Sequence, residues 1–464
     1  MNPLISVDQL SVYSKASCLV SPLTFNLHQD RPLTILGQTG SGKSLLAQAI
    51  MGLLPDSLTI KGKVSIFAKT LTKQEYRAMW GKELVMLPQE PWHALDPLMT
   101  SQKQVRDVYH WVVGQSKHIA NSSAMEALTS LGLDKSADKL PSELSGGMAQ
   151  RLAIVAATAG GASLILADEP TKGLDVSRRE EVIRLLQDKS QGGGLLTITH
   201  DVHVAKQLGG DIMVIKEGQL VESGTVEQVL SNPQAEYTKL LLQAQPSEWP
   251  IVDRDPSYFA KSDRIMQTEA LRLVRGGKTI IEDLSFTIAK GEVVGVVGDS
   301  GCGKSSLGDA LLGLLPLEAG SIERFDKKAK PHQWLKLYQD PPSAFSGSVS
   351  LARLLDDLIG LHGVDQARIR PLMARLSLSQ EILERTCLEV SGGELQRFAI
   401  LRALLLDPVF LFADEPTSRL DPITAKEVTM LLVELAREQC CSVLLVSHDP
   451  DMIRHTCDQV IALS

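Results

Sequence analysis

Short apolar runs recur along the chain, each five or six residues long and closely followed by a glycine or an ionisable residue. Runs of this length between turn residues are typical of buried strands in a parallel sheet. A helical pattern follows the first and the fourth of them. The predicted strands are PLTIL (32–36), LILAD (164–168), GLLTIT (194–199), EVVGVV (292–297), VFLFAD (409–414) and SVLLVS (442–447). This alternation predicts an α/β protein.

The longest uncharged apolar stretch is LAIVAATAGGASLILA (152–167), which Gly160 and Gly161 interrupt. It is shorter than the roughly 18 residues that a transmembrane helix needs. We interpret it as a helix, a turn and a buried strand. The start of the chain, MNPLISVDQL, also lacks the basic and apolar regions of a signal peptide. We therefore expect that the chain itself does not cross a membrane.

Four phrases occur twice along the chain and in the same order, which indicates an internal repeat. From Ser145 to Asp168 the spacing equals that from Ser391 to Asp414. The segment between the lysine of the GKS phrase and the serine of the SGG phrase is 15 residues longer in the first half. The paired phrases are GQTGSGKS (37–44) and GDSGCGKS (298–305), LSGGMAQR (144–151) and VSGGELQR (390–397), LILADEPTKGLD (164–175) and LFADEPTSRLD (411–421), and TITHD (197–201) and LVSHD (445–449).

A segment rich in Pro, Asp and Ser separates the repeats and shows neither helical nor strand periodicity. Such composition is typical of a linker. Three aromatic residues within it, Trp249, Tyr258 and Phe259, are expected to hold the linker against its own domain; a binding role is the alternative. The predicted division is a first domain at 1–244, a linker at 245–267 and a second domain at 268–464.

The composition is that of an ordinary globular protein, with 44% hydrophobic and 22% charged residues. The net charge of −8 speaks against a surface that neutralises phosphate backbones, so we expect no nucleic-acid partner. Six cysteines occur without a C-x-x-C pair or a Cys/His ligand spacing. They predict neither a zinc site nor a disulfide framework, and fit a reducing cytosol.

The phrases at 37–44 and 298–305, called the phosphate loops below, each lie between a predicted strand and a predicted helix. In that context G-x-x-x-x-G-K-S binds a nucleoside triphosphate, because the loop N–H groups and the helix start surround its phosphates. Lys43 and Lys304 would reach the β- and γ-phosphates, and Ser44 and Ser305 would hold Mg²⁺. The predicted nucleotide-binding residues are Gly37, Gly40, Ser41, Gly42, Lys43 and Ser44, and Gly298, Ser300, Gly301, Cys302, Gly303, Lys304, Ser305 and Ser306.

Acidic pairs end two of the predicted strands, and histidines follow two others. Asp168 and Asp414 are expected to bind Mg²⁺ through water. Glu169 and Glu415 are expected to orient and deprotonate the attacking water. Isolated Asp-Glu pairs are usually solvated surface charge and single histidines are usually structural, but both recur here at matching positions. His200 and His448 are therefore interpreted as γ-phosphate contacts.

These motifs resemble the ATP-binding cassette ATPases, and the specific element is the signature segment, 144–151 and 390–397. The resemblance implies ATP and Mg²⁺ as cofactors and two tandem P-loop NTPase domains. Each domain would have a parallel sheet core, an antiparallel β subdomain and a helical subdomain, at about 90–155 and 340–400. In this family two cassettes pair head to tail, and each signature segment caps the ATP of the other cassette. By analogy the halves form an intramolecular dimer through Ser145, Gly146, Gly147, Ser391, Gly392 and Gly393.

Further positions match by resemblance alone. Gln89 and Gln339 match the loop glutamine that senses Mg²⁺ and touches the membrane partner. Asp175 and Asp421 match the family's D-loop. Tyr13 matches the aromatic residue that stacks on adenine, whereas the second half has Val274 and Arg275 there. Since both halves keep Glu, His, Gln and the signature, two hydrolytically competent sites are expected.

Within the family, the chain is similar to importer ATPases of the peptide, nickel and opine class, here with both ATPases fused. This similarity lies in QEPWHALDPLMT (89–100), QDPPSAF (339–345) and NPQAEYTKLLL (232–242). It implies two integral permease subunits, an extracytoplasmic solute-binding protein and a peripheral location on the cytoplasmic face of the inner membrane. No iron–sulfur cluster is expected, because the cysteine cluster of many relatives is missing. Peptide, nickel ion and metal chelate or opine stay open as solutes.

The alternative function is that of a tandem cassette ATPase acting on ribosomes or nucleic acid. Ribosome-acting members resemble this chain in motif order but carry a long charged helical linker. The acidic balance also speaks against an RNA partner. DNA-repair relatives insert zinc modules, for which no cysteine pairs exist here.

Overall fold

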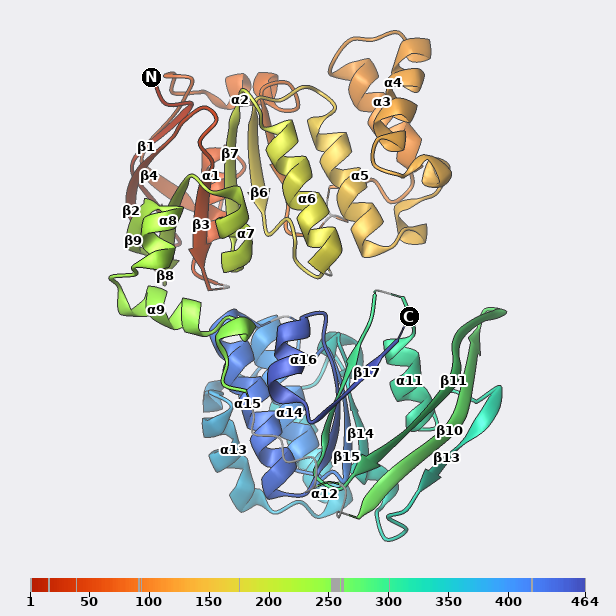
Figure 1. Cartoon of the computed structure of the whole chain (residues 1–464). Coiled ribbons are helices and arrows are strands. Elements are labelled where there is room, and N and C mark those ends of the chain that lie inside the picture. Colours follow the sequence, from red (N-terminus) through yellow and green to blue (C-terminus); the bar gives the residue numbers. More distant parts are fainter. Residues whose placement is uncertain are drawn as a thin grey trace. The chain divides into compact units, whose positions relative to one another are not determined.

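The computed structural model describes residues 2–15, 17–38, 40–90, 92, 94–174, 176–251, 259, 263–299, 301–418 and 420–463. The chain divides into two compact units, Met1–Leu242 and Gln243–Ser464. Figure 1 shows that each unit contains a central sheet, a smaller antiparallel sheet and a set of helices. The predicted α/β class with parallel sheet cores is confirmed.

The central sheet of the first unit has the strand order β5-β6-β7-β3-β8-β9. All neighbouring pairs are parallel except β8 and β9. The antiparallel sheet has the order β2-β1-β4. The strands are β1 (Ile5–Tyr13), β2 (Cys18–Leu27), β3 (Leu33–Gly37), β4 (Thr59–Ile66), β5 (Leu84–Leu87), β6 (Leu164–Asp168), β7 (Gly194–Thr199), β8 (Asp211–Lys216) and β9 (Gln219–Thr225).

Helices of the first unit lie on both faces of the central sheet. The helix α1 packs with the antiparallel strands on one face, and α5, α6 and α7 pack on the other. Figure 1 shows α3 and α4 beyond α5, where they form the helical subdomain. The helices are α1 (Lys43–Ile50), α2 (Lys73–Met79), α3 (Ser101–Trp111), α4 (Lys117–Thr129), α5 (Gly146–Thr158), α6 (Val176–Lys189), α7 (Val202–Leu208), α8 (Val226–Ser231) and α9 (Glu236–Gln243).

Strand β6 explains why these layers form. Leu164 and Leu166 face the core that contains α1, whereas Ile165 and Ala167 face the core under α5 and α6. Because successive side chains of a strand point to opposite faces, a fully apolar run is buried only when both faces are covered. The predicted buried strands are thus confirmed, and the apolar run of β6 contributes to two cores.

The second unit repeats this plan. Its central sheet has the order β14-β15-β16-β12-β17, entirely parallel, and its antiparallel sheet has the order β11-β10-β13. The strands are β10 (Arg264–Arg275), β11 (Lys278–Ala289), β12 (Val293–Val297), β13 (Ala319–Arg324), β14 (Trp334–Leu337), β15 (Phe410–Asp414), β16 (Ser442–Val446) and β17 (Gln459–Ala462). The helices are α11 (Lys304–Leu311), α12 (Leu351–His362), α13 (Ile369–Arg375), α14 (Gly392–Leu404), α15 (Pro422–Glu438) and α16 (Pro450–Thr456).

Part of the segment between the repeats is folded. The indole of Trp249 is buried in the second unit, its Nε1 donates to Ala244 O at 2.8 Å, and its carbonyl oxygen lies 2.6 Å from His455 Nδ1. Strand β10 already begins at Arg264. Tyr258 lies outside the described residues. In the described part of the chain, no helix combines the length and the apolar character that a bilayer span requires.

Candidate functional site

The phosphate loop of the first unit connects the end of β3 to the start of α1. Gly40 and Gly42 have φ angles of 84° and 83°, a left-handed conformation that glycine adopts without strain. The Lys43 ammonium turns back into the loop and donates to Gly37 O at 2.7 Å and to Gln38 O at 2.6 Å. The loop therefore holds a fixed positive charge at a helix start, an arrangement suited to phosphate.

The second unit builds the same loop between β12 and α11. Gly301 and Gly303 have φ angles of 88° and 104°. The Lys304 ammonium donates to Gly298 O at 2.7 Å and to Asp299 O at 2.9 Å, and it lies 4.0 Å from Cys302 Sγ. Ser300, which the sequence also assigns to this loop, lies outside the described residues.

Asp168 lies at the carboxyl end of β6, beside the phosphate loop, and is only 4% exposed. Burial raises the pKa of this carboxyl group, and a hydrogen bond from Ser44 partly opposes the rise. Its Oδ1 atom is buried and has no hydrogen-bond partner among the described residues. A buried carboxylate oxygen of this kind, next to a serine hydroxyl, fits Mg²⁺, which binds oxygen ligands.

Glu169 follows Asp168 in a strained backbone conformation, with φ at 49°. Its Oε1 lies 2.8 Å from His200 Nδ1, and its Oε2 accepts from the Thr199 hydroxyl at 3.3 Å. Burial would raise the pKa of Glu169, but the imidazole of His200 lowers it overall. Burial would lower the pKa of His200, but Glu169 raises it overall. The two groups thus favour a carboxylate and an imidazolium.

Sheet register explains why these residues meet. Asp168 is paired with Ile198, two residues before His200, and Leu36 is paired with Thr199. The carboxyl ends of parallel strands lie at one edge of a sheet, so the phosphate loop, the acidic pair and the histidine converge there.

The corresponding groups of the second unit make a different set of bonds. Glu415, again with φ at 49°, receives a hydrogen bond from Gln339 Nε2 at 2.7 Å and lies 2.6 Å from His448 Nε2. Ser305 donates to Asp414 Oδ1 at 3.1 Å. Burial raises the pKa of Asp414, while Ser305 and Lys336 oppose the rise. The sequence singled out every group here except Lys336.

A pocket of about 190 Å³ lies over the first phosphate loop. It brings together Gly40, Gly42, Lys43, Ser44, Leu45, Gln89, Asp168 and Glu169. Most of the residues predicted for the first site are in this set. Tyr13 lies at the end of β1, where the Lys61 ammonium is 4.7 Å from its ring centroid, and it does not line the pocket. Its role in stacking adenine remains a prediction.

The signature segments begin helices. Ser145 caps α5 by accepting from Met148 N at 3.4 Å, and Ser391 caps α14 by accepting from Glu394 N at 3.2 Å. The first N–H groups of such a helix have no partner within it, so they suit an anion. In the expected D-loops, Asp421 caps α15, while Asp175 lies outside the described residues.

Sequence reasoning missed one further contact of the first phosphate loop. The Tyr237 hydroxyl, from α9, accepts from Gln38 N at 3.1 Å. Tyr237 is buried, and the Lys216 ammonium lies 5.4 Å from its ring centroid. The only available signal was a tyrosine in an otherwise apolar helical pattern, which does not identify its partner.

Comparison with known proteins gives consistent matches. The ABC transporter family matches residues 20–172 and 281–418. The peptidoglycan transport ATP-binding protein YejF of Agrobacterium fabrum is 32% identical, over 99% of this chain and 91% of its own length. The glutathione import ATP-binding protein GsiA of Salmonella typhi is 29% identical, over 96% of this chain and 81% of its own length.

A solved structure described as RNase-L Inhibitor is similar in fold, with a TM-score of 0.68 at 21% identity, covering 97% of this chain and 87% of that one. A complex that contains an archaeal ribosome recycling factor has a TM-score of 0.68 at 22% identity, covering 98% and 87%. At this identity the likeness concerns the fold. Together with the two phosphate loops and acidic pairs, the family match establishes that the chain belongs to the ABC transporter family, as an ATP-hydrolysing member with two cassette regions.

Proposed function

We propose that the chain is the ATPase of an importer, and that it couples ATP hydrolysis in both units to two integral permease subunits. One observation carries the proposal: each unit places a phosphate-loop lysine, a buried Asp-Glu pair and a histidine at one edge of its sheet. This arrangement supplies a positive charge that can bind the triphosphate and a carboxylate that can deprotonate the attacking water.

In the proposed reaction, Lys43 and the loop N–H groups bind the β- and γ-phosphates. Glu169 orients the attacking water and accepts its proton, since its lowered pKa keeps it ionised. His200 holds the Glu169 carboxylate in place and contacts the γ-phosphate. Mg²⁺ would be held by Ser44, Gln89 and Asp168, and would neutralise phosphate charge. In the second unit Lys304, Glu415 and His448 act in the same way, with Ser305, Gln339 and Asp414 around the metal.

Head-to-tail pairing of the units completes each site in this proposal. Ser391 and Gly393 would close on the ATP held by Lys43, and Ser145 and Gly147 on the ATP held by Lys304. ATP would then stabilise a closed arrangement that ADP cannot. The segments around Gln89 and Gln339 would pass this change to the permeases.

The solute we propose is a peptide or a peptide-containing molecule, delivered by an extracytoplasmic binding protein. The names of the relatives refer to peptidoglycan transport and glutathione import. Both are compounds that contain peptide bonds, which favours this class over nickel ion or opines. The proposed location is the cytoplasmic face of the inner membrane.

Three experiments test the proposal. The Glu169→Gln, Glu415→Gln double variant should bind ATP normally but lose hydrolysis by at least about 100-fold, as expected for loss of a general base; unchanged hydrolysis would contradict the assignment of the base. The wild-type chain should co-purify with two integral membrane proteins from detergent-solubilised membranes. Deletion of the gene that encodes the chain should abolish cellular uptake of a labelled peptide. Co-sedimentation with ribosomes instead would favour the alternative function.

A further inference from the structure

The two sheet edges that are expected to bind Mg²⁺ differ at one partly buried strand position. Three residues before the loop glutamine, β5 has Met86 and β14 has Lys336. The positions are equivalent in register, because Met86 is paired with Leu166 and Lys336 with Phe412. Each paired residue lies two positions before the aspartate that is expected to hold Mg²⁺. The second unit therefore carries a lysine beside its metal site at a strand position where the first unit has a methionine.

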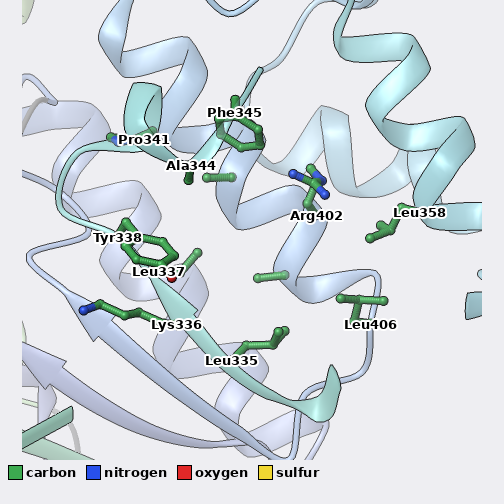
Figure 2. A pocket seen from close by; sticks show the side chains of 12 residues that line it. Leu335, Lys336, Leu337, Tyr338, Pro341, Ala344, Phe345, Leu358, Arg402 and Leu406 are labelled. Atoms are coloured by element: carbon green, nitrogen blue, oxygen red, sulfur yellow. The ribbon is translucent and has the colours of Figure 1, made fainter. Parts of the chain in front are cut away.

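The largely covered side chain of Lys336 lies between acidic and aromatic partners. Its side chain is 10% exposed, and its ammonium lies 2.6 Å from Asp309 Oδ1 and 3.7 Å from Asp414 Oδ2. The same ammonium is 5.2 Å from the ring centroid of Phe412 and 5.0 Å from that of Tyr338. Figure 2 shows the Lys336 side chain extending away from Arg402 and Phe345, which line the pocket of about 210 Å³ next to it. The ammonium thus belongs to the metal-site edge.

Further differences between the two units lie around Lys336 and accommodate its charged side chain. Asp309 on α11 stands where α1 has Gln48, and Phe412 stands where β6 has Leu166. The Phe412 ring packs against Gly308, where an added Cβ would lie 2.1 Å from the ring; the first unit has Ala47 there. Asp309 fixes the ammonium and the ring covers it, so the lysine is built into the second unit by several coordinated substitutions.

The consequence for the aspartate is electrostatic. Asp414 has both oxygens engaged, one by Ser305 and the other by Lys336. In contrast, Asp168 Oδ1 has no hydrogen-bond partner among the described residues. The Lys336 ammonium is paired with Asp309 at 2.6 Å, so its effect on Asp414 is local. It lies 3.7 Å from Asp414 Oδ2 and opposes the approach of a second cation to that oxygen.

We propose that Lys336 is a positioning residue that weakens Mg²⁺ binding at the second nucleotide site, so that the two ATP sites of this chain differ in their metal requirement. The inference rests on the proposed assignment of Asp414 and Asp168 to Mg²⁺. The first site loads MgATP at low metal concentration. The second site loads it only when the metal concentration is higher.

Metal binding, measured without turnover, tests this inference. Two variants of the full chain are used. Lys43→Ala leaves only the second site able to bind nucleotide, and Lys304→Ala leaves only the first. Mn²⁺ is titrated as the probe by electron paramagnetic resonance with a non-hydrolysable ATP analogue at saturation. We expect the apparent Kd for Mn²⁺ to be on the order of tenfold higher at the second site than at the first.

Substitutions of Lys336 then show whether this residue causes the difference in Kd. In the Lys43→Ala chain, Lys336→Met should lower the Kd for Mn²⁺ on the order of tenfold. The double change Lys336→Met, Asp309→Gln, which copies the first unit, should do the same without an unpaired Asp309. The matched control Lys336→Arg keeps the charge and should retain the high Kd. A Kd unchanged by both Lys336→Met variants, with the melting temperature retained, would overturn the inference.

Asp414→Asn separates this inference from the function on which it rests. Mn²⁺ binding at the second site should be lost in this variant. If Asp414→Asn leaves Mn²⁺ binding intact, the metal assignment itself is wrong and the inference falls with it. If Asp414→Asn abolishes binding while Lys336→Met changes nothing, only the role of Lys336 is refuted.

Discussion

The hydroxyl of Tyr237 accepts a hydrogen bond from the backbone N–H of Gln38 over 3.1 Å, which joins α9 to the first phosphate loop. Tyr237 comes late in the first unit, 199 residues after Gln38. The bond fixes the first residue of the loop after β3, next to the carbonyl groups that receive Lys43. The helix at the end of the first unit therefore helps to set the shape of its nucleotide site.

Removing this hydroxyl should weaken nucleotide binding. Tyr237→Phe keeps the buried ring but leaves Gln38 N without this acceptor, at a cost of about 1 kcal/mol for a typical hydrogen bond. In a chain that carries Lys304→Ala, we expect the Kd for ATP to rise roughly fivefold by isothermal titration calorimetry. Tyr109→Phe, in the helical subdomain, is the matched control and should leave the Kd unchanged. An unchanged Kd in Tyr237→Phe would show that the bond does not shape the site.

The His200–Glu169 pair predicts a pH dependence of stability. The folded-state pKa of His200 is raised above its ordinary value of 6.5, so its contribution is complete below 6.5 and is lost as pH rises through the raised value. The folded-state pKa of Glu169 is lowered below 4.5, so its contribution is complete above 4.5 and is lost as pH falls through the lowered value. Both contributions are present between pH 4.5 and 6.5.

Thermal melting of the nucleotide-free chain measures this dependence. The wild type should exceed His200→Gln in melting temperature by the widest margin between pH 4.5 and 6.5, and the margin should narrow at higher pH. His203→Gln, an exposed neighbour on α7, is the control and should show no such margin. A margin that widens as pH rises would contradict the assigned ion pair.

Local patterns predicted the parts of the site that lie on short segments. The strands that end at Asp168 and at Gly37 are continuous apolar runs, and the ends of parallel strands must meet at one edge, so both positions followed from the sequence. The Gln38–Tyr237 bond and the Lys336–Asp309 pair could not be predicted in this way, because each joins different elements through tertiary packing. Comparing the two repeats would have identified Lys336 as unusual, but not its partners.

The thiol of Cys302 predicts a chemical difference between the sites. It lies in the second phosphate loop, partly exposed, 4.0 Å from the Lys304 ammonium, where the first loop has Ser41. This places a partly exposed thiol where the phosphates of bound ATP are expected. N-ethylmaleimide should therefore modify Cys302 and block ATP binding at the second site, and bound ATP should slow the modification severalfold.

Peptide mass spectrometry distinguishes Cys302 from the exposed Cys18 and Cys440, which should react whether or not ATP is present. Cys302→Ser is the control: the reagent should then leave ATP binding intact. Equal reaction of Cys302 with and without ATP would place this thiol outside the nucleotide site.

Pairing of the units predicts which signature segment lies next to each bound ATP. In a chain with Lys304→Ala, a photoreactive group attached to the γ-phosphate of ATP should bind through Lys43. The N–H groups at the start of α14 other than the one that Ser391 caps can attract the phosphate, so the label should appear in residues 390–397. Lys43→Ala should reverse the pattern and label residues 144–151. Labelling of residues 144–151 in the Lys304→Ala chain would mean that each unit closes on its own nucleotide. The proposed coupling between the two halves would then fail, because ATP bound in one unit would make no contact with the other unit.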